Sequence, residues 1–288
     1  MLRTLKFIWT HPIASTHRGA ALCRYARWQL GTRLLATPCL IPFVESTQLL
    51  CERSMTGATG NLYCGLHEFG DMGFLLHYLR PGDLFVDVGA NIGSFTMLAS
   101  GVVGAESIAL EPVPATLAML RRNIAVNGIE ARVLALGVAA GSARRRVRFS
   151  CDRGCQNAAV DERYRGISTE VPMVPLDEIT TTMAPCLLKI DAEGADGDVI
   201  KGASDTLRNP TLSAVLVEGD SAAIATMMSD TGFARASYNP MTRSIVTRDG
   251  RPNRLPTDTR NNLWLRGVQG VQERCRTART FTVYECAF

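Results

Sequence analysis

The chain has 288 residues, of which 46% are hydrophobic and 20% charged, a globular composition that excludes disorder and can bury a full core. Its formal net charge of +4 is too small to indicate a nucleic-acid partner by itself. No run approaches the ~18 apolar residues of a membrane-spanning helix, and the first ten residues lack the pattern of a signal peptide. The nine scattered cysteines contain no CxxC pair, so we expect free thiols in a reducing cytoplasm.

The first 66 residues are predicted to form a basic extension. Residues 1–36 have a partly amphipathic helical pattern that is broken at Pro12. Residues 40–51 are strand-like, and residues 55–62 are rich in glycine and threonine and predict a loop.

The extension carries arginines and a lysine but no acidic residue before Glu45. It can therefore lie on anionic lipid with its tryptophans at the interface, which would make the protein cytoplasmic or peripheral at the inner face of the membrane. The pattern favours the alternative that the arginines face water while four side chains pack on the main domain: Leu22, Tyr25, Trp28 and Leu30.

From residue 67 to residue 288 the sequence predicts one further domain, in which helices and strands alternate as in a parallel sheet. The predicted elements in order are a helix at 67–79, strand 84–88, helix 92–100, strand 107–110, helix 114–127, strand 132–136, strand 145–150, strand 187–190, helix 196–207, strand 213–218 and helix 222–231. Residues 151–170 predict a loop over the site. The remaining strand-like segments, 233–238, 244–248 and 262–266, have no helix between them and predict an antiparallel finish.

Three motifs at the ends of predicted strands carry polar or flexible residues. The first is a glycine turn after the first core strand, with the residues Asp87, Val88, Gly89, Ala90, Asn91, Ile92 and Gly93. Glycine permits the sharp turn, so backbone N–H groups at the start of the next helix can approach an anionic ligand. The second is Glu111, which ends the next strand and is placed to accept hydrogen bonds from ribose hydroxyls.

The third motif, Lys189-Ile-Asp191-Ala-Glu193-Gly, ends the fourth core strand. If the first and fourth strands are neighbours where the strand order reverses, this pair of carboxylates faces the glycine turn. Alternatively, Asp191 or Glu193 caps the following helix.

Together with Lys201-Gly-Ala, these motifs resemble the FkbM family of methyltransferases over about residues 67–266, and residues 55–68 resemble the upstream segment of a bacterial subgroup. The resemblance implies a class I α/β fold with a doubly wound, mostly parallel, seven-stranded Rossmann-like sheet. It also implies S-adenosylmethionine as cofactor and O-methylation of a small-molecule or glycan acceptor, such as a sugar, a polyketide or another natural product. The chain departs from the family pattern at Ala195-Asp196, where members often carry a glutamate.

On this basis we expect Asp191 to act as general base or to orient the acceptor hydroxyl, with Glu193 beside it and His67 as a further candidate for proton transfer. The residues expected to contact the cofactor are Glu68, Asp87, Gly89, Ala90, Asn91, Gly93, Glu111 and Asp191. No third ligand for a divalent cation is identifiable beside the Asp191 and Glu193 pair, so no metal is predicted.

Two other functions remain open. A NAD-dependent oxidoreductase also uses a glycine turn and an acidic residue, but the spacing of Gly89, Asn91 and Gly93 differs from Gly-x-Gly-x-x-Gly. The other is a non-catalytic, cofactor-binding scaffold at a membrane surface. Pro185-Cys186 and Asn239-Pro240-Met241 only partly resemble the motifs of nucleic-acid methyltransferases and lie at the wrong strands, so no nucleic-acid partner is expected.

Overall fold

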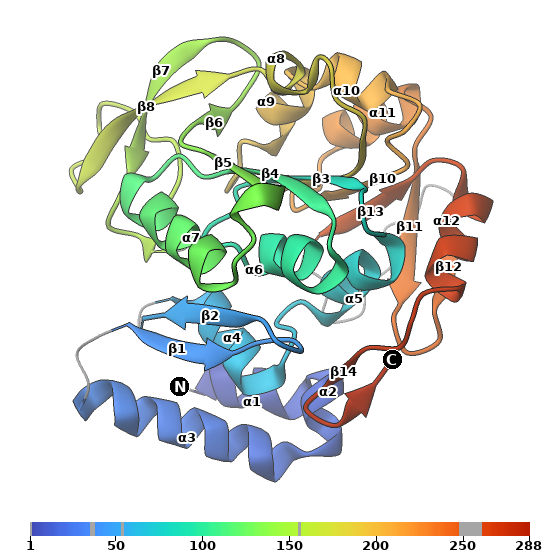
Figure 1. The fold of residues 1–288 in the computed structure, drawn as a ribbon. Helices are drawn as coiled ribbons and strands as arrows, with labels where there is room; N and C mark the ends of the chain where they lie inside the picture. Colours follow the sequence, from blue (N-terminus) through green and yellow to red (C-terminus); the bar gives the residue numbers. More distant parts are fainter. Residues whose placement is uncertain (1, 35–37, 53–54, 155–156, 248–260) are drawn as a thin grey trace.

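The computed structural model describes residues 2–34, 38–52, 55–154, 157–247 and 261–288. A central sheet of eight strands runs through the molecule (Figure 1). In spatial order the strands are β12 (Ser244–Thr247), β11 (Ala234–Asn239), β13 (Asn262–Leu265), β10 (Ala214–Val217), β9 (Pro185–Ile190), β3 (Leu84–Val88), β4 (Glu106–Leu110) and β5 (Val133–Leu136).

The strand directions confirm the predicted class. The pairs formed by β5, β4, β3, β9 and β10 are all parallel, whereas β13 is antiparallel to β10 and to β11. The sheet has eight strands where the family resemblance implies seven, because the strand that begins at Ser244, which the sequence also predicts, pairs with β11 at the edge. The order reverses between β3 and β9, which lie side by side as the sequence predicts.

Helices cover both faces of this sheet (Figure 1). One face carries α5 (Phe69–Tyr78), α6 (Ser94–Thr96), the π-helix η1 (Met97–Val103), α7 (Pro114–Val126) and α12 (Val268–Arg276); the other carries α8 (Leu176–Thr180), α9 (Asp196–Lys201), α10 (Ser204–Arg208) and α11 (Ala222–Asp230). Successive strand residues enter opposite cores, as Phe85 and Val86 do. The predicted helix at 196–207 is divided at Gly202, where a Cβ atom would lie 2.0 Å from the carbonyl oxygen of Gly141.

A smaller sheet of three strands stands beside the carboxyl end of β5. In spatial order it contains β6 (Ala139–Ala140), β8 (Ser168–Val174) and β7 (Arg145–Ser150). In the chain these strands follow the short 3-10 helix η2 (Glu130–Arg132) and β5. The predicted loop at 151–170 is therefore too long, because its last residues form the start of β8 and pair with β7.

The N-terminal extension contains α1 (Leu2–Thr10), α2 (Pro12–Thr16), α3 (Arg18–Leu34), the hairpin of β1 (Cys39–Pro42) and β2 (Gln48–Cys51), and α4 (Thr56–Cys64). The loop predicted at 55–62 is wrong. Most of α4 is covered by other elements, with Ala58, Thr59 and Asn61 buried, so tertiary packing overrides the weak helix propensity of glycine and threonine. The C-terminus forms a second hairpin, β14 (Thr282–Val283) with β15 (Cys286–Ala287).

Packing is continuous between the extension and the sheet domain. Ile8 and Trp28 belong to the same hydrophobic cluster as Phe69 and Leu120. The expected inward packing thus holds for Trp28, but it is wrong for Leu30, which is 63% exposed. The division of the chain at residues 66 and 67 stays a prediction.

Two chain-wide features complete the description. Within the ranges that the structure describes, no helix has both the length and the apolar character needed to cross a bilayer. The cysteines in the same ranges are free thiols, and most of them are buried.

Candidate functional site

A cavity lies at the carboxyl ends of the strands, where the strand order reverses between β3 and β9. It encloses about 680 Å³, including the space at its mouth. Its walls come from the glycine turn, the end of β4, the segment after β5, the three-stranded sheet and the loop after β9, with the lining residues Val88, Gly89, Asn91, Leu110, Glu111, Pro112, Val138, Ala139, Ala140, Phe149, Asn157, Ala159, Met173, Asp191, Ala192, Glu193 and Ala195. Open parallel sheets bind their ligands in this crevice.

The glycine turn is held against the end of β9. Gly89 has a φ of 78°, and a Cβ atom at this position would lie 1.9 Å from the carbonyl oxygen of Asp191. Gly93 has a φ of 92°, and its Cβ would lie 2.5 Å from Leu120 on α7. Both positions require glycine for conformation and for space.

The N–H groups of this turn are used within the chain, contrary to the expectation that they are available to a ligand. Those of Gly89 and Ala90 donate to the Leu110 carbonyl, that of Asn91 to Glu111, that of Ile92 to the Asn91 side chain and that of Gly93 to the Ala90 carbonyl. Gly89 and Asn91 line the cavity, while Ala90 and Gly93 shape the turn without lining it.

Glu111 lies on the cavity wall. Its Oε2 accepts a hydrogen bond from the N–H of Asn91 at 3.0 Å, and its Oε1 accepts one from the N–H of Val113 at 2.9 Å. Burial raises the pKa of Glu111 to about 7 in spite of these two donors. Since each carboxylate oxygen can accept two hydrogen bonds, Glu111 retains acceptor capacity for a pair of hydroxyl groups.

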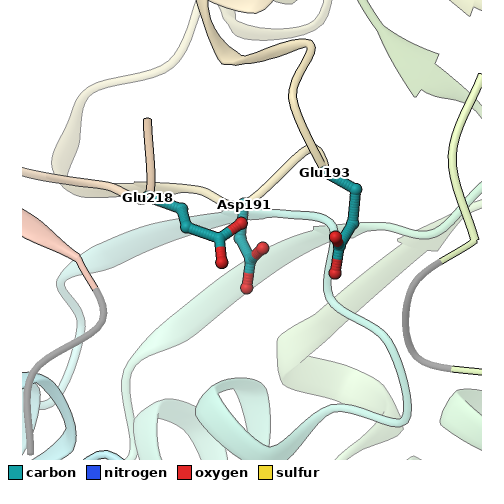
Figure 2. A group of neighbouring side chains, drawn as sticks. All are labelled: Asp191, Glu193 and Glu218. Carbon is teal, nitrogen blue, oxygen red and sulfur yellow. The ribbon is translucent and has the colours of Figure 1, made fainter. Parts of the chain in front are cut away.

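Three carboxyl groups lie close together beyond the ends of β9 and β10; Asp191 and Glu193 line the other side of the cavity, and Glu218 lies beside them. Asp191 directly follows β9, Glu193 lies in the loop to α9, and Glu218 directly follows β10; one oxygen of each lies within 4.8 Å of the others. Figure 2 shows all three carboxyl groups pointing toward the same space. Glu193 has a φ of 47°, a conformation that non-glycine residues rarely adopt and that often occurs at functional sites.

Glu218 is the residue that the sequence analysis missed. Its desolvation, followed by the charge of Asp191 and a hydrogen bond with it, raises the pKa of Glu218 to about 8. Three carboxylates this close repel one another unless they share a proton or a cation. The trio has the oxygen chemistry to hold a divalent cation, whereas the sequence offered only two such groups.

Lys189 supplies positive charge beneath this cluster. It is 3% exposed, its Nζ lies 2.9 Å from Oδ2 of Asp191, and the same ammonium group lies over the ring of Phe95. Burial by itself would lower the pKa of Lys189, but the carboxylates of Asp191, Asp87 and Glu68 raise it above its usual value.

Asp87 and Asp196 have supporting roles. Asp87 is buried beside Lys189 on the neighbouring strand and accepts a hydrogen bond from Oγ1 of Thr96 at 2.8 Å, so it supports the turn without lining the cavity. Burial raises its pKa. Asp196, the first residue of α9, accepts a hydrogen bond from the N–H of Ala192 in the preceding loop, at 2.9 Å.

His67 and Glu68 are not part of the cavity wall. The ring of His67 packs 4.9 Å from that of Phe7, and its Nδ1 occupies the space where Gly60 would carry a Cβ atom. Glu68 is buried and accepts a hydrogen bond from Asn261 at 3.1 Å. His67 therefore joins the extension to the sheet domain, and Glu68 contributes negative charge near Lys189.

Comparison with known proteins finds related sequences and similar folds. A "Methyltransferase 1" of the fungus Beauveria bassiana is 29% identical over 189 residues, which are 56% of this chain and 76% of the relative. The "31-O-demethyl-FK506 methyltransferase FkbM" of Streptomyces tacrolimicus is 39% identical over 87 residues, which are 29% of this chain and 34% of the relative. Among solved structures, a transferase of Pyrococcus horikoshii is similar over 80% of this chain and 70% of its own, with 11% identity and a TM-score of 0.43.

The family model described as "Methyltransferase FkbM domain" matches residues 87–234, slightly more than half of the chain. The match begins at the buried aspartate of the glycine turn, spans Glu111 and all three clustered carboxylates, and ends at the start of β11. The chain therefore belongs to the FkbM family of methyltransferases.

Proposed function

We propose that this protein transfers the methyl group of S-adenosylmethionine to a hydroxyl oxygen of a small-molecule or glycan acceptor, such as a sugar or a polyketide. The observation that carries the proposal is a single cavity that has Glu111 on one wall and Asp191 and Glu193 on another.

The residues on the first wall have the chemistry that this cofactor requires. Glu111 offers acceptor oxygens for the ribose hydroxyls, and the Gly89 and Asn91 turn lies beside it. Phe149 and Met173 of the three-stranded sheet add apolar surface on which an adenine ring can pack. The cofactor supplies an electrophilic methyl group on a sulfonium, which is already a good leaving group.

The carboxyl cluster can position the acceptor and remove its proton. An alcohol is a poor nucleophile until a base withdraws its proton. Asp191 is paired with the ammonium group of Lys189, and its carboxyl oxygens can accept a hydrogen bond from the acceptor hydroxyl. Glu218, with its raised pKa, can hold the released proton near neutral pH.

The names of the relatives support a hydroxyl acceptor. The Streptomyces tacrolimicus relative is named for an O-demethyl compound, so its name refers to methylation at oxygen. Its aligned segment is about a third of that protein, which leaves the acceptor of the present chain to experiment.

The first test is a calorimetric titration with S-adenosylhomocysteine. Glu111→Ala removes charged hydrogen bonds worth about 1.5–3 kcal/mol, so the dissociation constant should rise about 10- to 100-fold. Glu106→Ala is the matched control, because Glu106 is exposed at the opposite end of the same strand and should bind as the native protein does. Lack of binding, or a preference for NAD, would overturn the cofactor assignment and favour the oxidoreductase alternative.

A further inference from the structure

The outward faces of α1 and α3 carry large apolar side chains that no other part of the described protein covers. Along these faces Leu2 is 82% exposed, Trp9 54%, Leu30 63% and Leu34 85%. Of the ten large hydrophobic side chains that are exposed in the described ranges, five belong to the first 40 residues. Such clustering is typical of a binding surface and not of ordinary solvent exposure.

The same two helices carry cations without nearby anions. Arg3, Lys6, Arg18, Arg27 and Arg33 are exposed, and none of them forms an ion pair with a carboxylate of the described chain. Many arginines elsewhere form such ion pairs, for example Arg276 with Glu273 and Arg279 with Glu45. We call the exposed residues of α1 and α3 the basic–apolar face.

Helical spacing and packing place this face outward. Lys6 and Trp9 on α1 are three residues apart, as are Arg27 and Leu30 on α3, while Ile8 and Trp28 point into the core. The guanidinium group of Arg18 lies 4.8 Å from the Trp9 ring and so joins the two helices. Figure 1 shows α1 and α3 next to each other at one end of the molecule, away from the central sheet.

We propose that the basic–apolar face docks on an anionic lipid bilayer, with Trp9 and the leucines in the interfacial layer and the cations at the headgroups. Interfacial helices combine basic residues with tryptophan and leucine in this way. A nucleic acid or an acidic polymer would satisfy the cations, but it would leave the four apolar side chains in water. No residue of α1 or α3 lines the cavity, whose first lining residue in the chain is Val88. Docking and cofactor binding can therefore be tested separately.

The test uses the full-length protein and vesicles of phosphatidylcholine, with and without phosphatidylglycerol. Trp28 and Trp264 are buried, so Trp9 is the exposed one of the three tryptophans and its fluorescence reports the docking. We expect a blue shift of emission with the anionic vesicles only, and quenching by lipids brominated near the headgroup. Replacement of Trp9 by Phe should abolish the shift.

Two sets of substitutions separate the electrostatic attraction of the cations from the burial of the apolar side chains. Arg27→Gln with Arg33→Gln should weaken vesicle binding about 25-fold at low salt, or about five-fold for each cation, and should reduce its salt dependence. Leu30→Ser with Leu34→Ser should weaken binding about ten-fold or more at every salt concentration. Leu134→Ser with Val246→Ser is the matched control, because both side chains are exposed on strands of the central sheet and should not matter.

Thermal unfolding and S-adenosylhomocysteine binding check that each variant is folded. The proposal is overturned if neutral and anionic vesicles bind equally, if neither binds, or if the leucine variants bind as the native protein does. Binding to duplex DNA that depends on the arginines and not on the leucines would instead identify a surface for anionic polymers.

Discussion

Lys189 is expected to be essential for stability because its ammonium group compensates buried carboxylates below the cavity. It is almost inaccessible to solvent, is bonded to Asp191 at 2.9 Å and is electrostatically coupled to Asp87 and Glu68. Lys189→Met keeps the length of the side chain and removes its charge. Removal of one partner from a buried ion pair leaves an uncompensated charge, so we expect the free energy of unfolding to fall by about 3–5 kcal/mol.

The loss should depend on pH with a definite sign. Burial already raises the pKa of Asp87 in the native protein, and Lys189 is the largest opposing influence. Without the ammonium group, the folded-state pKa of Asp87 rises further above its unfolded value of about 3.9. The folded variant then binds more protons than the unfolded chain, so its deficit grows as pH rises above about 4 and becomes constant above the folded-state pKa.

Urea unfolding of Lys189→Met, followed by circular dichroism between about pH 4 and pH 8, measures both effects. Lys201→Met is the control, because Lys201 is an exposed lysine at the end of α9 and its loss should change stability by less than about 0.5 kcal/mol. A deficit below about 1 kcal/mol for Lys189→Met, with the same pH dependence as the native protein, would show that the carboxylates are already protonated and would refute this reasoning.

Two further predictions follow from conformation and burial. Gly89→Ala should destabilise the protein by more than about 2 kcal/mol and abolish S-adenosylhomocysteine binding, because its Cβ would collide with the Asp191 carbonyl; Gly194→Ala, also at positive φ but in open space, should cost about 1 kcal/mol in thermal unfolding. Burial lowers the pKa of His11 and of His77 to about 4, whereas an unfolded histidine titrates near 6.5. The unfolded chain therefore binds more protons below about pH 6.5, and stability should be lost as pH falls toward 4, with a slope of about 1.4 kcal/mol per pH unit for each histidine. If His11→Leu leaves the slope of the urea-derived stability unchanged, the buried-histidine explanation is wrong.

The sheet was predictable because its strands are short apolar runs that alternate with helices. The hydrophobic periodicity and the order of these elements along the chain alone indicate a parallel core. The failures occur where packing decides the local structure. The α4 segment has the composition of a loop, yet it is helical because the buried Thr59 and Asn61 are held between other elements. Gly202 divides α9 from α10 because it is in close contact with Gly141, a residue 61 positions earlier that no local pattern connects to it.

The site was predictable where a motif directly follows a strand. Glu111 and Asp191 lie at strand ends, and the parallel arrangement places those ends at one edge of the sheet. His67 and Glu68 were predicted to belong to the site from the chemistry of their side chains and from the family resemblance. Both residues directly precede α5, and neither argument determines the direction in which their side chains point. In the structure His67 contacts Phe7, and Glu68 contacts Asn261.

Glu218 shows why sheet order carries chemical information that a motif does not. In the sequence it is an acidic residue after an apolar strand, 27 positions beyond Asp191. In the sheet, Val217 is paired with Ile190, and the N–H of Glu218 donates to the Ile190 carbonyl, so Asp191 and Glu218 leave adjacent parallel strands at the same level. This register converts the two carboxylates of one motif into a cluster of three and raises the pKa of Glu218 toward neutral pH. The base of the proposed reaction therefore depends on the pairing of β9 with β10, and a substitution that shifts this register would change the chemistry of the site without altering any residue in it.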